Sequence, residues 1–143
     1  MYVKQISVFI ENQPGKLVGF TELLAREGIN LIALSIADTT NFGILRCIVY
    51  DYEHAAKVVN DAGYTARVTD VLAVSVPDKP GGMARAIRIL TDAGISIEYL
   101  YSFVRNVTDN ALLIFRVEEL ERAVNVLTDN GVTLLSLEQV QSL

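Results

Sequence analysis

The chain has 143 residues, 51% of them hydrophobic, and its 17 acidic and 12 basic residues give a formal net charge of -5. This acidic balance argues against functions that require neutralising nucleic-acid phosphates or anionic lipid. No apolar run approaches the roughly 20 residues that span a bilayer, and the first residues lack a signal-peptide pattern. The single cysteine, Cys47, cannot form an intramolecular disulfide. We therefore expect a cytoplasmic protein with small molecules or proteins as partners, without nucleic acid, membrane, metal or cofactor.

Alternating and helical patterns follow one another along the first half of the chain. Residues 2–11 alternate as a strand, and residues 16–27 carry a helical apolar stripe that Gly28 ends. Residues 29–38 and 44–50 read as a hairpin around a turn at 39–43. Asp51 is a candidate N-cap for a helix that Gly63 ends, and residues 64–69 read as a last short strand. The order is therefore βαββαβ.

The second half repeats this order. Residues such as Pro14, Gly15 and Gly28 recur 66 positions later, and after the hairpin the offset becomes 68, so the second hairpin loop gains two residues around 106–110. We expect an α+β fold of two tandem ferredoxin-like modules, 1–70 and 71–143, each a four-stranded antiparallel sheet with two helices on one face. No glycine, proline or polar linker separates residues 64 and 76, so the last strand of one copy should pass almost directly into the next.

The turn between the first strand and first helix of each copy is the candidate site. It reads Asn-Gln-Pro-Gly-Lys-Leu at 12–17 and Asp-Lys-Pro-Gly-Gly-Met at 78–83. Unpaired N–H groups and the helix dipole at such a terminus favour a carboxylate or phosphate. Uncharged acceptors such as the side-chain oxygens of Asn12 and Asn30 suit an ammonium group. These needs match those of an amino acid.

The βαββαβ order, the Asn-x-Pro-Gly-x-Leu turn and the Gly-Ile-Asn-Leu element at 28–31 closely resemble the ACT-domain family, as a tandem pair covering nearly the whole chain. The resemblance implies a non-catalytic regulator that binds amino acids or similar metabolites at interfaces between modules. We also expect a homodimer, because two small modules expose sheet edges and apolar residues such as Phe9, and a partner enzyme is a further possible partner. The ligand-binding positions expected are Asn12, Gln13, Pro14, Gly15, Lys16, Leu17, Asn30, Leu31, Asp78, Lys79, Gly81, Gly82, Met83, Ser96 and Ile97.

Within that family, residues 9–17 look like the serine-binding module of phosphoglycerate dehydrogenase, whose two ligand-holding asparagines match Asn12 and Asn30. The histidine of that motif is replaced by Ile10, which indicates a different side-chain pocket. In the second copy Asp78 and Ser96 stand at the asparagine positions, so the two copies should respond differently to ligand. Gly82 replaces Lys16, which we interpret as closer access to backbone amides.

The sequence leaves open an alternative function and the role of one aromatic strand. A ligand-independent interaction or assembly module is the alternative function. The alternation Ile97, Tyr99, Tyr101 and Phe103 places aromatic residues on one strand face, as core, pocket wall or, by preference, subunit contact. His54 and Cys47 lack the neighbours that catalysis would require, and no catalytic residues are expected.

Overall fold

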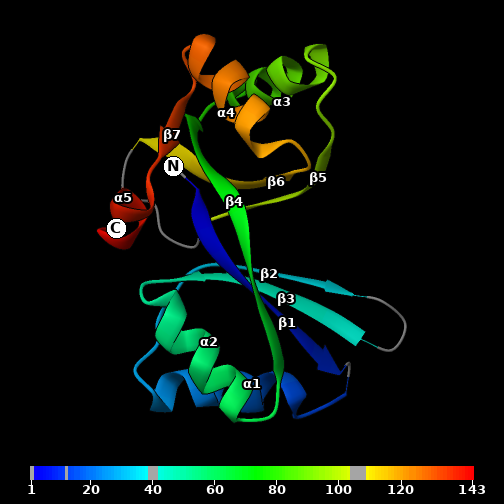
Figure 1. Ribbon diagram of the computed structural model, residues 1–143, viewed down its shortest axis with the longest axis vertical. Helices are drawn as coiled ribbons and strands as arrows, with labels where there is room; N and C mark the ends of the chain where they lie inside the picture. Colours follow the sequence, from blue (N-terminus) through cyan, green and yellow to red (C-terminus); the bar gives the residue numbers. More distant parts are fainter. Residues whose placement is uncertain (1, 12, 39–41, 104–108) are drawn as a thin grey trace. The chain divides into compact units, whose positions relative to one another are not determined.

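The computed structural model describes residues 2–11, 13–38, 42–103 and 109–143. Strands and helices follow one another along these residues in the expected order (Figure 1). The elements are β1 (Val3–Glu11), α1 (Lys16–Arg26), β2 (Leu31–Asp38), β3 (Phe42–Val49), α2 (Tyr52–Asp61), β4 (Thr65–Pro77), α3 (Gly82–Asp92), β5 (Ile97–Ser102), β6 (Asn110–Val117), α4 (Leu120–Asp129), β7 (Thr133–Leu135) and α5 (Leu137–Gln141).

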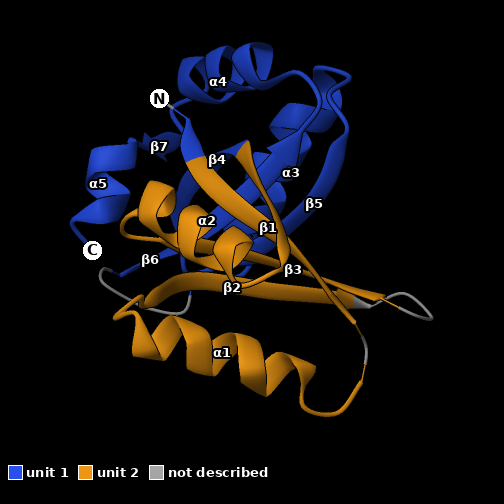
Figure 2. Ribbon diagram, turned by 60° about the horizontal axis from the view of Figure 1, so that its bottom comes forward, with its two compact units in different colours: residues 1–3, 70–143 blue, residues 4–69 orange. Residues whose placement is uncertain are grey.

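The chain divides into two compact units, coloured separately in Figure 2. Unit 2 comprises residues 4–69, and unit 1 comprises residues 1–3 together with 70–143. β4 belongs to both, because its 13 residues run without interruption from Thr65 to Pro77. The last strand of the first copy and the first strand of the second are therefore one continuous strand, and no linker separates them.

In unit 2 the hydrogen-bonded strand order is β2, β3, β1 and β4. β3 is antiparallel to both β1 and β2. Alternate residues of β1, namely Ile6, Val8 and Ile10, form a buried cluster with Phe20 and Leu24 of α1 and with Ala55 and Val59 of α2. Both helices consequently cover the same face of the sheet, as Figure 1 shows.

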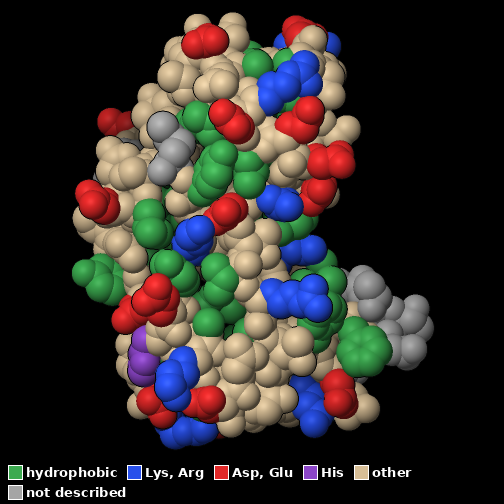
Figure 3. All heavy atoms as spheres, viewed as in Figure 1, with side chains coloured by type: hydrophobic (Ala, Val, Ile, Leu, Met, Phe, Trp, Pro, Cys, Tyr) green, Lys and Arg blue, Asp and Glu red, His purple; other side chains and the backbone are tan. Residues whose placement is uncertain are grey.

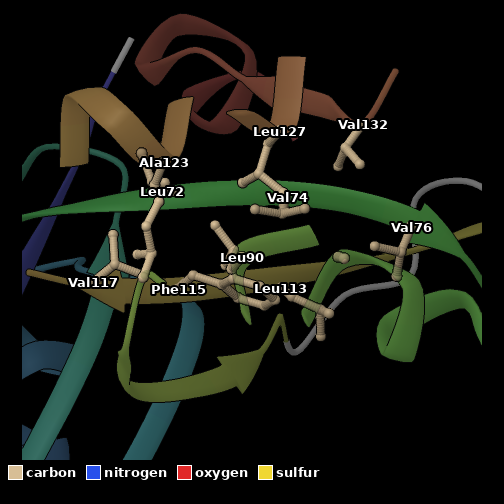
Figure 4. Close-up of a cluster of buried hydrophobic side chains, with 12 residues drawn as sticks. Leu72, Val74, Val76, Leu90, Leu113, Phe115, Val117, Ala123, Leu127 and Val132 are labelled. Atoms are coloured by element: carbon tan, nitrogen blue, oxygen red, sulfur yellow. The ribbon is translucent and has the colours of Figure 1, made fainter. Parts of the chain in front are cut away.

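Unit 1 is built the same way around β4 and β6. β6 pairs antiparallel with β4 and β5, and β7 pairs antiparallel with β4. The side chains of the core point inward from the strands and from α3 and α4 (Figure 4). The buried members are Leu72, Val74, Val76, Ala86, Leu90, Ile95, Leu113, Phe115, Val117, Ala123, Leu127 and Val132.

Local sequence signals account for the helix ends. The Asp51 side chain accepts a hydrogen bond from the His54 N–H at 3.0 Å, so Asp51 is the N-cap of α2 as expected. α1 ends before Gly28, and the next residue, Ile29, donates its N–H to the Leu24 carbonyl at 2.8 Å. This bond over five residues is the Schellman pattern that follows a C-terminal glycine. The helix stops expected at Gly28 and Gly63 are confirmed.

Two details differ from the sequence expectations. β3 begins at Phe42 and not at residue 44, because Phe42 pairs with Glu11 of β1. α5 was not anticipated, although Ser136 and Gln139 form a complete capping box at its start. Residues 104–108, which include part of the loop insertion expected around 106–110, and residues 39–41 of the first hairpin turn lie outside the described residues.

The expected aromatic row on β5 is also wrong in part. The pairing with β6 shifts register between Ile97 and Tyr99, so Ile97 and Leu100 pack against the core of unit 1. Tyr99 and Tyr101 stack on one another with ring centroids 6.5 Å apart. Tyr101 is buried within the chain, as is Phe103, so these two rings are not available for the preferred subunit contact.

Acidic, basic and hydrophobic side chains are interspersed on the face of the molecule drawn in Figure 3. Large apolar side chains that remain substantially exposed include Phe9, Leu17, Val18, Ile36, Phe42, Tyr50, Val68 and Met83. Among the described helices, none is both long enough and apolar enough to cross a membrane.

Candidate functional site

The two Pro-Gly turns have the same backbone hydrogen bonds. In unit 2 the bonds run from Gln13 N–H to Glu11 O (2.9 Å), from Lys16 N–H to Gln13 O (3.2 Å) and from Gly19 N–H to Gly15 O (3.1 Å). In unit 1 they run from Lys79 to Pro77 (2.9 Å), from Gly82 to Lys79 (3.0 Å) and from Arg85 to Gly81 (3.0 Å). Each bond has its counterpart 66 residues later. The repeat seen in the sequence is therefore a repeat of turn geometry.

In each turn the residue before the helix is a glycine whose backbone adopts the left-handed conformation. Gly15 has φ 91° and Gly81 has φ 88°, and neither helix start has a side-chain cap. An L-residue with a side chain adopts this region at a cost, so glycine is required by the backbone itself. The first turns of α1 and α3 hold no acidic side chain. Both helix starts are thus suited to a negative group.

Gly82 has a different reason for being glycine from the one the sequence suggested. A Cβ built on Gly82 would lie 2.0 Å from the Pro77 carbonyl oxygen, and Gly82 is itself buried. The missing side chain therefore makes room for the chain's own backbone. Lys16, at the equivalent position, carries an exposed side chain.

The expected site residues fall into two places in each unit. The turn residues Gln13 to Leu17 are exposed at the start of α1, whereas Asn30 and Leu31 lie where β2 begins, beyond the end of α1. α1 has 11 residues, which makes it about 16 Å long. In unit 1, residues 78–83 and Ser96 with Ile97 occupy the corresponding ends of α3. Asn12 lies outside the described residues.

A cavity lies at the equivalent place in each unit. In unit 2 a cavity of about 440 Å³ is lined by Phe9, Ile10, Glu11, Lys16, Phe42, Ala62, Gly63, Tyr64 and Thr65. In unit 1 a cavity of about 190 Å³ is lined by Ser75, Val76, Pro77, Gly82, Arg85, Ala86, Asn110, Gly131, Val132 and Thr133. Every lining residue of unit 2 except Ala62 has its repeat-equivalent lining the cavity of unit 1. Of the expected site residues, Lys16 and Gly82 reach these cavities.

The cavity residues that the sequence analysis did not assign come from separate parts of unit 2. Phe9 and Glu11 belong to β1, Phe42 begins β3, and Tyr64 precedes β4. Only the sheet brings them together, so local spacing gave no signal. One signal was available for their neighbour Gly19, because a glycine inside a helix costs about 1 kcal/mol relative to alanine. The Tyr64 hydroxyl lies 3.7 Å from the position that a Cβ on Gly19 would take, which is an ordinary contact distance, so a side chain larger than a methyl group would meet Tyr64.

Titratable groups give little indication of chemistry. Burial raises the pKa of the Cys47 thiol to about 12, which disfavours the reactive thiolate. No group of three or more His, Cys, Asp and Glu side chains suitable for a metal ion occurs in the part of the chain that the structure describes.

Comparison with known proteins assigns the chain to a family. The family model described as an ACT domain pair matches residues 1–143. The chain belongs to the ACT-domain family. Protein BT0572 from Bacteroides thetaiotaomicron is similar in structure with a TM-score of 0.92 and 40% sequence identity, and the match covers 100% of this chain and 98% of that one. Among curated proteins, no relative matches this chain.

More distant solved structures share the fold. The regulatory subunit of aspartate kinase from Thermus thermophilus, in its ligand-free form, is 18% identical with a TM-score of 0.62, and the match covers 90% of this chain and 92% of that chain. The regulatory subunit from Thermus flavus, also 18% identical, has a TM-score of 0.60, with 88% and 90% covered. The resemblance inferred from the Pro-Gly turn and the βαββαβ order is thus confirmed at the level of family.

Proposed function

We propose that this ACT domain pair is a non-catalytic, cytoplasmic regulator that binds an amino acid beside its strand-helix turns. The observation that carries the proposal is the recurrence of a cavity at equivalent positions in both units, each reached by the residue that follows the turn glycine. Regulatory subunits of aspartate kinase share the fold, which supports a role in controlling a partner enzyme. The buried free Cys47 agrees with a reducing compartment.

The chemistry of the turn suits the two ends of an amino acid. The start of α1 favours the α-carboxylate, and Lys16 places a positive side chain at the same point. Acceptors for the α-ammonium are the Glu11 carboxylate, which lines the cavity, and the amide oxygens of Asn12 and Asn30. Ligand binding would then shift the protein between states that differ in affinity for the ligand.

The position of Asn30 bears on how the protein assembles. A small ligand cannot reach both ends of α1, because the helix is about 16 Å long. If one ligand contacts the turn and Asn30 together, Asn30 comes from a second copy of the chain. We therefore propose a homodimer with its ligand at an interface between modules. The exposed Leu17 and Val18 in the first turn of α1 supply apolar surface for that contact.

The alternative function is a ligand-independent assembly module that acts on a partner enzyme. The same exposed apolar residues on α1 favour it, since they suit a protein contact whether or not a ligand is bound. Ligand titration separates the two functions.

The test is calorimetric titration of the full chain with each of the twenty standard amino acids. At least one should bind, and Asn12→Ala and Asn30→Ala should each weaken that ligand at least tenfold while the circular dichroism spectrum is unchanged. Asp78→Ala and Ser96→Ala, the matched positions of the second copy, serve as controls and should have smaller effects. Unchanged affinity in both asparagine variants would move the site elsewhere. Sedimentation at micromolar concentration should show a dimer, and a monomer with and without ligand would remove the proposed interface.

A further inference from the structure

The cavity of unit 2 combines aromatic walls with one charge of each sign. Phe9, Phe42 and Tyr64 contribute the rings, and Glu11 and Lys16 contribute the charges. Phe9 is 48% exposed and Phe42 is 52% exposed. Rings left that open to water gain from being covered by another apolar or aromatic group, since a buried aromatic ring removes roughly 150–250 Å² from water.

The charges of this cavity are not committed to one another. Within the part of the chain that the structure describes, no ion pair includes Glu11 or Lys16. A zwitterion can use both, with its ammonium group on Glu11 and its carboxylate on Lys16 beside the start of α1. The cavity volume of about 440 Å³ also lies inside the range of roughly 300–1,000 Å³ that is usual for small-molecule sites.

The cavity of unit 1 lacks the aromatic rings and the carboxylate. Ser75 and Asn110 stand where unit 2 has Phe9 and Phe42, and the Asn110 amide donates to the Ser75 hydroxyl at 3.1 Å. Val132 replaces Tyr64, while Pro77 and Gly82 replace the two charged residues. The volume, about 190 Å³, falls below the usual range.

One further residue difference changes the lining of the unit 1 cavity. Arg85 lies on α3 where α1 has Gly19, and it lines the cavity. Its guanidinium donates to the Asn130 carbonyl at 2.6 Å, directly before the lining residue Gly131. This contact ties α3 to the segment after α4, at a helix position where α1 has no side chain.

We infer that the cavity of unit 2 binds an α-amino acid with an aromatic side chain, with one such ligand bound per chain. The inference rests on the proposed function, because it names the class of amino acid and the repeat that binds it. The side-chain ring lies against Phe9, Phe42 and Tyr64, and the α-amino and α-carboxylate groups pair with Glu11 and Lys16.

Calorimetric titration with phenylalanine, tyrosine, tryptophan and histidine, against leucine, methionine and glutamine, tests the inference. At least one aromatic amino acid should bind tenfold or more tightly than any of the other three, with a stoichiometry of one per chain. An aliphatic or polar amino acid as the tightest ligand, or two per chain, would overturn it and leave the proposed function intact. Absence of binding by any of the twenty standard amino acids would overturn both.

Variants locate the site. Phe42→Ala should weaken the aromatic ligand at least tenfold, whereas Asn110→Ala, its repeat-equivalent, should change affinity less than twofold. Phe9→Leu keeps apolar volume and removes the ring, so it should weaken aromatic ligands while leaving leucine unchanged. Gly19→Arg, which places in unit 2 the residue found at position 85, should abolish binding in a protein that circular dichroism shows to be folded. Equal affinities of the native chain and Phe42→Ala would contradict the assignment.

Discussion

Replacing Gly82 by alanine should destabilise unit 1 far more than its single added methyl group suggests. The new Cβ would lie 2.0 Å from the Pro77 carbonyl oxygen, whereas real contacts of this kind essentially never fall below 3.0 Å. The two groups must therefore separate by at least 1.0 Å, the difference between those distances. Pro77 and Gly82 are both held by backbone hydrogen bonds of the turn, through Lys79, so neither moves independently.

The magnitude follows from what must give way. Loss of one turn hydrogen bond costs about 1 kcal/mol, and forcing a methyl group into a filled site costs about 1–3 kcal/mol. We expect Gly82→Ala to lower the free energy of unfolding by about 3 kcal/mol. Equilibrium unfolding in urea, followed by circular dichroism, measures this change.

Two controls make the experiment specific. Lys16→Ala alters the same position of the first copy, where the side chain is exposed, and should change stability by less than about 0.5 kcal/mol. Gly43→Ala adds a methyl group whose nearest neighbour, the Ile10 carbonyl oxygen, lies at an ordinary contact distance of 3.5 Å. A loss below 1 kcal/mol for Gly82→Ala would refute the steric reasoning and restore ligand access as the reason for this glycine.

Three further predictions concern other local features. Gly15→Ala and Gly81→Ala should each lower the free energy of unfolding in urea by about 1–2 kcal/mol, because both glycines have φ near +90°. An unchanged free energy for either variant would mean that its turn readily adopts another conformation. Asp51→Ala should lower the same free energy of unfolding by about 1 kcal/mol, because α2 loses its N-cap hydrogen bond. Glu119→Ala should have a smaller effect, because the Glu119 side chain makes no cap hydrogen bond to α4. Equal losses in the two variants would contradict the role of Asp51 as a cap. Burial raises the pKa of the Cys47 thiol from 9.0 to about 12, so the thiol of the unfolded chain loses its proton at lower pH than that of the folded chain. The free energy of unfolding should therefore fall between pH 9 and 12, by up to about 1.4 kcal/mol per pH unit relative to Cys47→Ala, and should not fall below pH 9. Parallel pH profiles of the two proteins would argue against that shift.

The fold was readable from the sequence because its signals are local and occur twice. The Pro-Gly turns, the glycine after each helix and the Asp51 cap each determine the backbone within a few residues. The short helix α5 carried an equally local signal in Ser136 and Gln139, and was missed because it has no counterpart in the first copy.

The candidate site was only partly predictable, because its walls are assembled by strand pairing. Lys16 was predictable because it adjoins the turn, whereas no sequence pattern places Phe42 and Tyr64 beside it. The roles of Gly82 and Arg85 depend on distances to Pro77 and Asn130, which no spacing rule supplies. Strand register was equally unpredictable from the sequence. The register shift between Ile97 and Tyr99 of β5 places Ile97 against the core and interrupts the expected alternation with the tyrosines.

The most direct test of amino-acid binding by this ACT pair is its thermal unfolding midpoint in the presence of each standard amino acid. A ligand that binds only the native state adds about 2.7 kcal/mol at 100 times its dissociation constant. For a chain of this size that corresponds to a rise of roughly 5–10 °C. If the protein binds an amino acid, at least one of the twenty should produce such a rise. Because the proposed function is non-catalytic, that amino acid should be recovered chemically unchanged. A midpoint that no amino acid raises, even at millimolar concentration, would contradict the proposed binding.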